Sequence, residues 1–166
     1  MKKDLFYGLL AILCLTSAQT LFAQTTDVTD NGGTKKAQYS PEKREEDFPM
    51  LFDNNKNTKY CYGFSSNLWI QYQSPVPVVV NGYSISSAND VPERDPRNWK
   101  LLGSVDGKKW VTLDSQGKEA FEERMQTKVY SFENTTPYTY YRLHVTSNNG
   151  DQATQFSEWR LLSETK

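Results

Sequence analysis

The sequence predicts an all-β fold, an antiparallel β-sandwich of the jelly-roll type, on three observations. Apolar and polar residues alternate with a period of two in segments rich in aromatic and β-branched residues, as in half-buried strands. Helical signals are nearly absent, and the best candidate, residues 117–126, is short enough to be one turn within a loop. Turn-forming residues separate the alternating segments, as they do in sandwiches and jelly rolls.

About eight short strands are expected from this alternation. In chain order they are residues 34–39, 67–73, 78–87, 99–104, 109–114, 128–132, 139–146 and 155–162. The Asp106-Gly107 pair predicts a hairpin turn between the fourth and fifth of them. Large aromatic side chains dominate core burial, so we expect all four tryptophans to pack in the core or against a sheet. These are Trp69, Trp99, Trp110 and Trp159.

Residues 1–23 are expected to be a signal peptide rather than part of the fold. Lys2 and Lys3 form a short basic start, and the apolar run of residues 5–15 that follows is too short to span a bilayer. Cleavage is expected near Ala23, with Thr16-Ser17-Ala18 as a second candidate for the cleavage point. The alternative is an uncleaved N-terminal anchor. The remaining residues, 24–166, are expected to form a single domain that is exported to a bacterial periplasm, cell surface or medium.

The charge and cysteine content of the expected mature segment argue against several classes of function. Removing the leader leaves 17 basic and 19 acidic residues, a net charge of −2, which lacks the basic footprint of a nucleic-acid binder. Cys61 is the one cysteine in the segment, so no internal disulfide is expected. The segment also lacks an apolar stretch near 18 residues long, so no membrane insertion is expected.

Five stretches carry a family resemblance, in order and at matching spacing. They are residues 51–60 (LFDNNKNTKY), 86–99 (SSANDVPERDPRNW), 102–110 (LGSVDGKKW), 140–150 (YYRLHVTSNNG) and 157–159 (SEW). On these stretches the sequence resembles the F5/8 type C (discoidin) superfamily of galactose-binding-like domains, close to the family 32 carbohydrate-binding modules. The resemblance covers roughly residues 30–162 and implies a jelly-roll sandwich.

The resemblance also implies a structural calcium site, and the local chemistry agrees with it. Ca²⁺ takes oxygen ligands from carboxylates, amides, hydroxyls and carbonyls, and the turn that begins at Asp53 is dense in such oxygens. By motif position, Asp53 and Thr58 supply side-chain oxygens, Asn55 supplies a backbone or side-chain oxygen, and Glu158 closes the site. Asn54 stands where the family often has glycine, and asparagine tolerates a left-handed backbone. The alternative is that these residues only form a turn.

In related modules a sugar sits on loops at one end of the sandwich, where an aromatic ring stacks on it and polar side chains bind its hydroxyls. The candidates here are Tyr60, Tyr62, Phe64, Asn89, Asp90, Glu93, Arg94, Asn148, Asn149 and Gln152. The histidine that many sugar-binding members carry after the calcium loop is missing, and the only histidine, His144, lies in an expected strand. Alternatively, Glu93, Arg94 and Asp95 form an internal salt bridge that fixes their loop.

Catalysis is not expected from this sequence. The close acidic pairs, Glu93 with Asp95 and Glu122 with Glu123, lack the context of a glycosidase pair. One histidine and one mature cysteine argue against a zinc site. The expected function is therefore a secreted, non-catalytic, lectin-like module that binds a glycan or terminal sugar. The alternative is an adhesion domain that uses the same sandwich to contact a protein partner.

Overall fold

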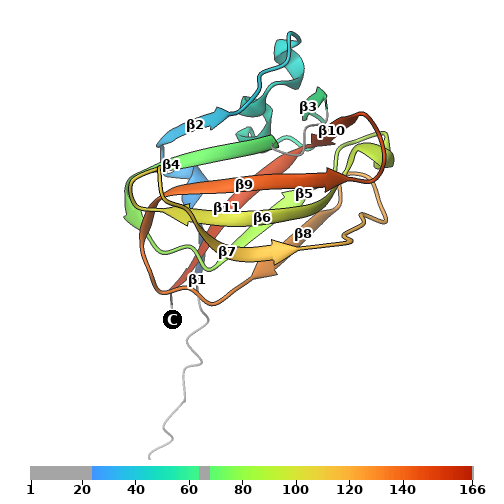
Figure 1. The fold of residues 1–166 in the computed structure, drawn as a ribbon. Coiled ribbons are helices and arrows are strands. Elements are labelled where there is room, and N and C mark those ends of the chain that lie inside the picture. The colour runs from blue at the N-terminus through green and yellow to red at the C-terminus, as the bar shows by residue number, and fades with distance from the viewer. Residues whose placement is uncertain (1–23, 64–67, 166) are drawn as a thin grey trace, which may run out of the picture.

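The computed structural model describes residues 24–63 and 68–165, which form a β-sandwich (Figure 1). A five-stranded sheet in the order β2-β4-β9-β6-β7 faces a four-stranded sheet in the order β1-β11-β5-β8. A small two-stranded sheet, β10-β3, lies at one end. All strand pairs among the described residues are antiparallel, so the predicted antiparallel sandwich is confirmed.

The described residues contain eleven strands and four short 3-10 helices. The strands are β1 (Gln24–Asp27), β2 (Thr34–Ala37), β3 (Tyr60–Gly63), β4 (Leu68–Val78), β5 (Gly82–Ser86), β6 (Pro96–Ser104), β7 (Val111–Gln116), β8 (Thr127–Ser131), β9 (Tyr138–Asn148), β10 (Ala153–Phe156) and β11 (Glu158–Thr165). The helices are η1 (Val28–Asp30), η2 (Arg44–Glu46), η3 (Phe48–Phe52) and η4 (Pro92–Arg94).

Several of the predicted elements differ from the structure. Strands β1 and β3 were not expected, and the segment 155–162 is split at Ser157 into β10 and β11, which belong to different sheets. Residues 117–126, the best candidate for a helical turn, contain no helix. This segment is a loop whose Phe121 is buried, and burial of that ring holds the loop against the sandwich without a helical turn. The hairpin at Asp106-Gly107 is confirmed by the pairing of β6 with β7.

The core fills the space between the two large sheets with the inward-facing residues of each strand. Trp99 and Trp159 are almost completely buried there, as expected. The Trp99 indole N–H donates to the Tyr83 hydroxyl at 2.9 Å, and that hydroxyl donates to Asp114 Oδ2 at 2.6 Å. The buried polar atoms of Trp99 and Tyr83 therefore both have hydrogen-bond partners. Trp69 and Trp110 are only half-buried.

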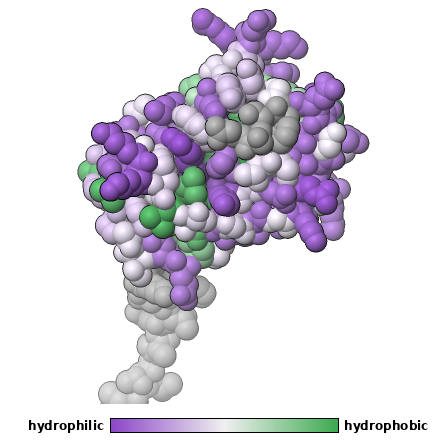
Figure 2. All heavy atoms as spheres, viewed as in Figure 1, coloured by the Kyte–Doolittle hydropathy of each residue, from purple (hydrophilic) through white to green (hydrophobic). Residues whose placement is uncertain are grey.

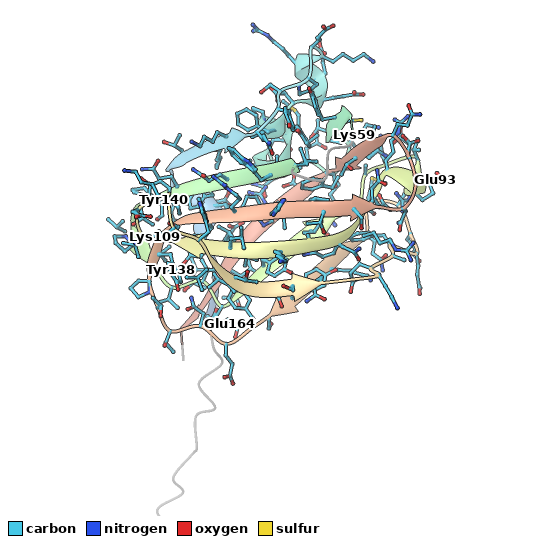
Figure 3. The ribbon with its side chains drawn as sticks, in the orientation of Figure 1. Lys59, Glu93, Lys109, Tyr138, Tyr140 and Glu164 are labelled. Carbon is cyan, nitrogen blue, oxygen red and sulfur yellow. The ribbon has the colours of Figure 1, made fainter. Side chains whose placement is uncertain are left out.

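The strand directions place three long connections together at one end of the sandwich, here called the loop end. It comprises residues 87–95, 117–126 and 149–152, which are linked by backbone hydrogen bonds from Met125 to Ala88 and from Asn149 to Asp95. Figure 3 shows Glu93 of the loop end on the opposite side of the molecule from Lys109 and Tyr138. Within the residues that the structure describes, no helix is long and apolar enough to cross a membrane.

Candidate functional site

In the turn predicted to bind calcium, one backbone N–H contacts two carboxylates. The Asn55 N–H donates both to Asp53 Oδ1 at 2.9 Å and to Glu158 Oε1 at 2.8 Å, which brings the two carboxylates together across more than a hundred residues. Thr58 Oγ1 lies 2.7 Å from Asp53 Oδ2 and 2.7 Å from the Asn55 carbonyl oxygen. Asn54 has a φ of 60°, so it adopts the left-handed backbone where the family often has glycine.

Glu158 is the most deeply buried member of this cluster. Burial raises the pKa of Glu158 to about 7, although the neighbouring Arg160 and the Asn55 N–H both oppose the shift. Arg160 Nη2 donates to Glu158 Oε2 at 2.7 Å, and its Nη1 pairs with Asp30 Oδ1 at 2.9 Å. Arg160 therefore binds one oxygen of Glu158 from inside the protein and leaves the other directed toward the turn.

The donor set of this turn fits a hard cation. Two carboxylates, a hydroxyl and a carbonyl are oxygen ligands of the kind that Ca²⁺ prefers, and the ion accepts six to eight of them. No three His, Cys, Asp or Glu side chains come together among the described residues, so a cation here would depend on hydroxyl and carbonyl oxygens as well as carboxylates. Asp53, Asn55, Thr58 and Glu158 are the residues that would hold it.

At the loop end, Asp90 forms the centre of a polar cluster. Lys59 Nζ donates to Asp90 Oδ1 at 2.6 Å and to Asn89 Oδ1 at 3.3 Å. Gln155 Nε2 reaches the same Asp90 oxygen at 2.8 Å. Partial burial raises the pKa of Asp90, but the hydrogen bonds from Lys59 and Gln155 outweigh it and hold the pKa below its usual value. About half of the Asp90 side chain stays exposed, at 51 %, so a ligand can reach this carboxylate.

Ion pairs fix the loops around this cluster, as the alternative interpretation expected, but with other partners. Arg94 Nε lies 3.4 Å from Asp151 Oδ1, which joins residues 87–95 to residues 149–152. The Asp95 side chain has no exposed surface, and Arg124 binds it through both terminal guanidinium nitrogens, Nη1 and Nη2. The predicted salt bridge within the Glu93-Arg94-Asp95 segment itself is therefore wrong.

The aromatic candidates differ sharply in exposure. Tyr60 is completely buried in the core and its hydroxyl donates to the Tyr39 carbonyl at 3.0 Å, so the prediction that it contacts a sugar is corrected. Tyr62 is half-buried and stacks on Tyr39 with ring centroids 5.0 Å apart. Phe64 lies outside the described residues. Tyr62 therefore remains the aromatic candidate in this part of the structure.

The side chains of Asn148 and Asn149 stabilise the last loop by binding backbone carbonyls. The Asn148 amide donates to the carbonyls of Asp151 and Ala153 at 2.9 and 2.8 Å, and the Asn149 amide donates to the Pro92 carbonyl at 3.3 Å. These bonds hold the loop closed and tie it to its neighbour. Glu93 and Gln152 are exposed beside them and are the more accessible candidates (Figure 3 labels Glu93).

The loop of residues 87–95 also contains an unusual backbone conformation. Val91 has φ 36° and ψ 77°, in the left-handed region that a β-branched residue rarely adopts. The Val91 carbonyl accepts hydrogen bonds from the Arg94 N–H at 3.1 Å and from Gln155 Nε2 at 3.3 Å, and these contacts hold the strained residue in place. Strained backbone persists only where the surrounding structure maintains it, and it is found more often at functional sites.

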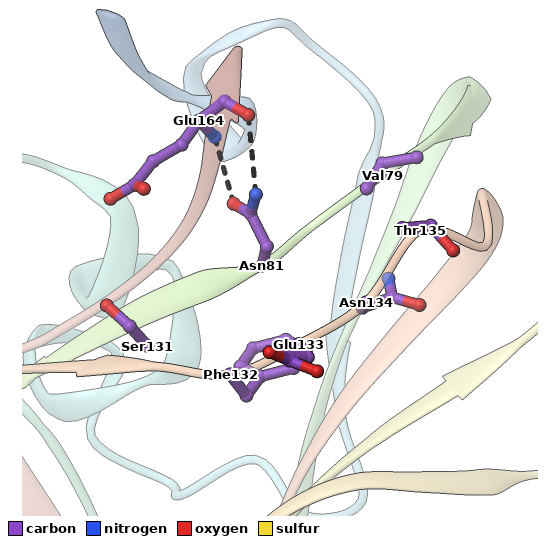
Figure 4. A pocket seen from close by; sticks show the side chains of 8 residues that line it. All are labelled: Val79, Asn81, Ser131, Phe132, Glu133, Asn134, Thr135 and Glu164. Carbon is purple, nitrogen blue, oxygen red and sulfur yellow. Dashed lines mark hydrogen bonds between the residues drawn. The ribbon is translucent and has the colours of Figure 1, made fainter. Parts of the chain in front are cut away.

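Two cavities lie away from the predicted sugar contacts. The larger, of about 660 Å³, is at the end opposite the loop end, between the β4–β5 connection and the β8–β9 connection (Figure 4). Its lining includes Phe132, Glu133 and Asn134, and Asn81 exchanges two hydrogen bonds with the backbone of Glu164 at its rim. The smaller, of about 210 Å³, lies beside Glu158.

The structure thus combines an antiparallel β-sandwich with an oxygen-rich turn at Asp53 and a polar cluster at the loop end. The profile of the F5/8 type C domain matches residues 29–159, and the chain belongs to this family. An F5/8 type C domain from Bacteroides fragilis superimposes with a TM-score of 0.73 at 15% identity, covering 86% of this chain and 98% of that one.

Two family 32 carbohydrate-binding modules of Clostridium perfringens have the same fold. One, in complex with GalNAc-β-1,3-galactose, gives a TM-score of 0.66 at 14% identity, covering 83% of this chain and all of that one. The other, from NanJ in complex with galactose, gives 0.67 at 10% identity, covering 84% of this chain and all of that one. At these identities the likeness shows the fold alone.

A curated relative matches a shorter part of the chain. A peptide-N(4)-(N-acetyl-β-glucosaminyl)asparagine amidase of Arabidopsis thaliana is 54% identical over 56 residues. The match covers 33% of this chain and spans only 8% of the length of that enzyme.

Sequence reasoning missed two residues of the loop-end cluster. Lys59 directly follows the turn predicted to bind calcium, and its positive charge beside an exposed acidic loop was a signal that could have been used. Gln155 was assigned to a strand, and alternation of polar and apolar residues gives no sign that its amide is buried. Tyr39, which stacks on Tyr62, offered no local signal.

Proposed function

We propose that this protein is a non-catalytic carbohydrate-binding domain that binds a sugar at the loop end, beside Asp90. The exposed carboxylate of Asp90, held by Lys59 and Gln155, is the observation that carries the proposal. A fixed carboxylate accepts hydrogen bonds from paired sugar hydroxyls, and such charge-assisted bonds are stronger than neutral ones. Asn89 supplies an amide that shares Lys59 with Asp90. Tyr62 of strand β3 is the partly exposed ring to be tested with it.

Related domains support the ligand class. The two Clostridium perfringens modules are described in complex with galactose and with GalNAc-β-1,3-galactose. The partial Arabidopsis relative is named for an N-acetyl-β-glucosaminyl substrate. Galactose, N-acetylgalactosamine and N-acetylglucosamine are therefore the first sugars to test.

The proposal includes a structural calcium ion and export. Calcium bound by Asp53, Asn55, Thr58 and Glu158 would neutralise two carboxylates and clamp the turn to strand β11. Export rests on the basic start and short apolar run at the N-terminus, which lie outside the described residues. The proposed place of action is a periplasm, a cell surface or the medium.

An adhesion function through an apolar face is less well supported. The large apolar side chains exposed among the described residues belong to separate elements, and no aromatic residue is among them. They are Val76, Val105, Val111, Met125 and Val129. A protein-binding face usually presents a contiguous apolar area with aromatic residues at its centre.

Calorimetric titration with the three sugars and the disaccharide tests the proposal, with calcium present. We expect weak binding by the wild type, and about tenfold weaker binding by Asp90→Asn because one charge-assisted hydrogen bond becomes neutral. Glu133→Gln is the matched control, since Glu133 is exposed beside the larger cavity at the opposite end.

The control should bind like the wild type. If Glu133→Gln lost binding while Asp90→Asn retained it, the sugar would bind at the end opposite the loop end, and the proposal would be contradicted. The absence of binding heat with every sugar of the panel would contradict a sugar-binding function.

A further inference from the structure

The outer face of the five-stranded sheet carries side chains that no role described so far explains. The strand register places them in three rows that run across the strands. The first is Lys36, Gln71, Arg142, Leu102 and Thr112; the second is Trp69, His144, Lys100 and Ser115; the third is Thr34, Gln73, Tyr140 and Ser104. Five strands spaced at the usual interval give the first row a length of about 19 Å. We call these three rows the row surface.

The row surface contains no carboxylate. Two acidic residues lie close by in the sequence, but both are engaged elsewhere: Asp114 accepts a hydrogen bond from the Tyr83 hydroxyl, and Asp106 accepts the backbone N–H groups of Lys108 and Lys109. Lys36 and Lys100 are exposed on the row surface. The row surface therefore carries the cations Lys36, Lys100 and Arg142 and no acidic side chain, although the protein as a whole has a net charge of −1 (Figure 2 views the molecule from this side).

Arg142 lies at the centre of the row surface between two indole rings. Its guanidinium carbon is 4.0 Å from the ring centroid of Trp69 and 4.0 Å from that of Trp110. Lys36 Nζ lies 5.9 Å from the Trp69 centroid. Stacking on an aromatic face stabilises a cation and fixes the plane of the guanidinium.

The charge of Arg142 is not neutralised by an acid in the described part of the chain. Its Nη2 donates to Gln71 Oε1 at 2.8 Å, its Nε is shielded from solvent without a hydrogen-bond partner, and none of the described ion pairs includes it. Burial lowers the pKa of Arg142, but a guanidinium keeps its proton in proteins. A desolvated and uncompensated cation is costly unless an anion approaches it.

We propose that the row surface is a second binding surface, for an acidic polysaccharide whose carboxylates lie along the rows against Lys36, Arg142 and Lys100. The charge of this surface is complementary to such a chain, and the rows are long enough to contact several of its sugar units. Guanidinium groups bind carboxylates in a planar, bidentate geometry, and the half-buried indoles flank that position with apolar surface. The row surface is separate from the loop end and does not depend on binding there.

Affinity electrophoresis of the full chain through polygalacturonate tests the proposal, with fully methyl-esterified polymer as the neutral comparison. The wild type should be retarded by the acidic polymer and not by the esterified one. Retardation should fall as salt rises from about 50 to 200 mM, since exposed charges are screened over shorter distances.

Two variants locate the binding. Lys36→Gln/Lys100→Gln changes only exposed side chains, and Arg142→Gln removes the central cation. Each should weaken binding by about tenfold. Lys43→Gln is the matched control, because Lys43 is exposed outside the rows. Melting curves show whether Arg142→Gln folds; if it does not, the double lysine variant decides.

Unchanged retardation in the double lysine variant would overturn the proposal, as would the absence of retardation in the wild type. Equal binding of single-stranded DNA would also overturn it, because the surface would then be a non-specific cation patch. Galactose titration of the same variants separates this surface from the loop end: binding of the sugar should persist when binding of the polymer is lost.

Discussion

Asp95 is a fully buried carboxylate whose charge depends on one partner, Arg124. Burial raises the pKa of Asp95, and the hydrogen bonds from Arg124 oppose that shift. The pair joins residues 87–95 to residues 117–126, so it holds together the loops that carry the candidate sugar site. A broken pair would leave an uncompensated buried charge.

Arg124→Met should destabilise the protein by about 3 kcal/mol at neutral pH, because one partner of a buried ion pair is removed. The pKa of the unpaired Asp95 would rise further, so the folded state would hold a proton that the unfolded state releases. Stability of the variant should therefore fall as pH rises above the ordinary pKa of aspartate. Urea unfolding at about pH 4 and pH 7 measures this, and a penalty that is smaller at neutral pH would contradict it. Arg97→Met, at an exposed arginine, is the control.

The proposed calcium site at Asp53 and Glu158 leads to a second prediction at this scale. Calcium should raise the melting temperature, and a chelator should reverse the effect, because an ion that binds only the folded state stabilises it by about 2.7 kcal/mol at 100 times its Kd. Asp53→Asn keeps a hydrogen-bond acceptor but loses the charge, so its melting temperature should no longer respond to calcium. Glu122→Gln, at an exposed acid, should respond like the wild type. An equal response in Asp53→Asn would argue against the site.

At the scale of the element, strand β6 illustrates how closely the sandwich packs. A Cβ atom on Gly103 would lie 2.8 Å from the Tyr138 ring and 3.0 Å from the Leu113 side chain. Both neighbours are parts of strands and cannot move freely. Glycine is therefore required here by the approach of β9 and β7.

Gly103→Ala should lower the free energy of unfolding by about 1 to 3 kcal/mol, the usual cost of overpacking a core. Gly117→Ala is the control, since its Cβ would make an ordinary contact of 3.5 Å with Asn98. Equal denaturant midpoints for the two variants would mean that the packing around Gly103 is looser than described.

The elements also show what the sequence could predict. Alternation located most strands, because a residue such as Leu143 or Trp99 is buried by its own strand's pleat. The resemblance to a family motif correctly predicted that Asp53 and Glu158 lie close together. Alternation failed at Ser157, where the chain passes from one sheet to another without a change of pattern. The resemblance failed for Tyr60, which was expected to contact a sugar but is buried against Phe156, a residue far away in the sequence.

At the scale of the whole molecule, three surfaces of interest lie on different parts of the sandwich. The loop end gathers Asp90 and its partners, the row surface lies across β2, β4, β9, β6 and β7, and the larger cavity lies at the opposite end (Figures 1 and 4). A rigid core between the sheets allows each surface to vary without disturbing the others. Binding of a small sugar beside Asp90 is therefore expected to depend on the loops of the loop end rather than on the sheets.

A crystal structure of the protein soaked with the best-binding sugar tests the sugar site most directly. The sugar should lie at the loop end, with hydroxyls within hydrogen-bond distance of Asp90 or Asn89. Density for the sugar only in the cavity beside Phe132 and Asn134, or none at a saturating concentration, would contradict the assignment.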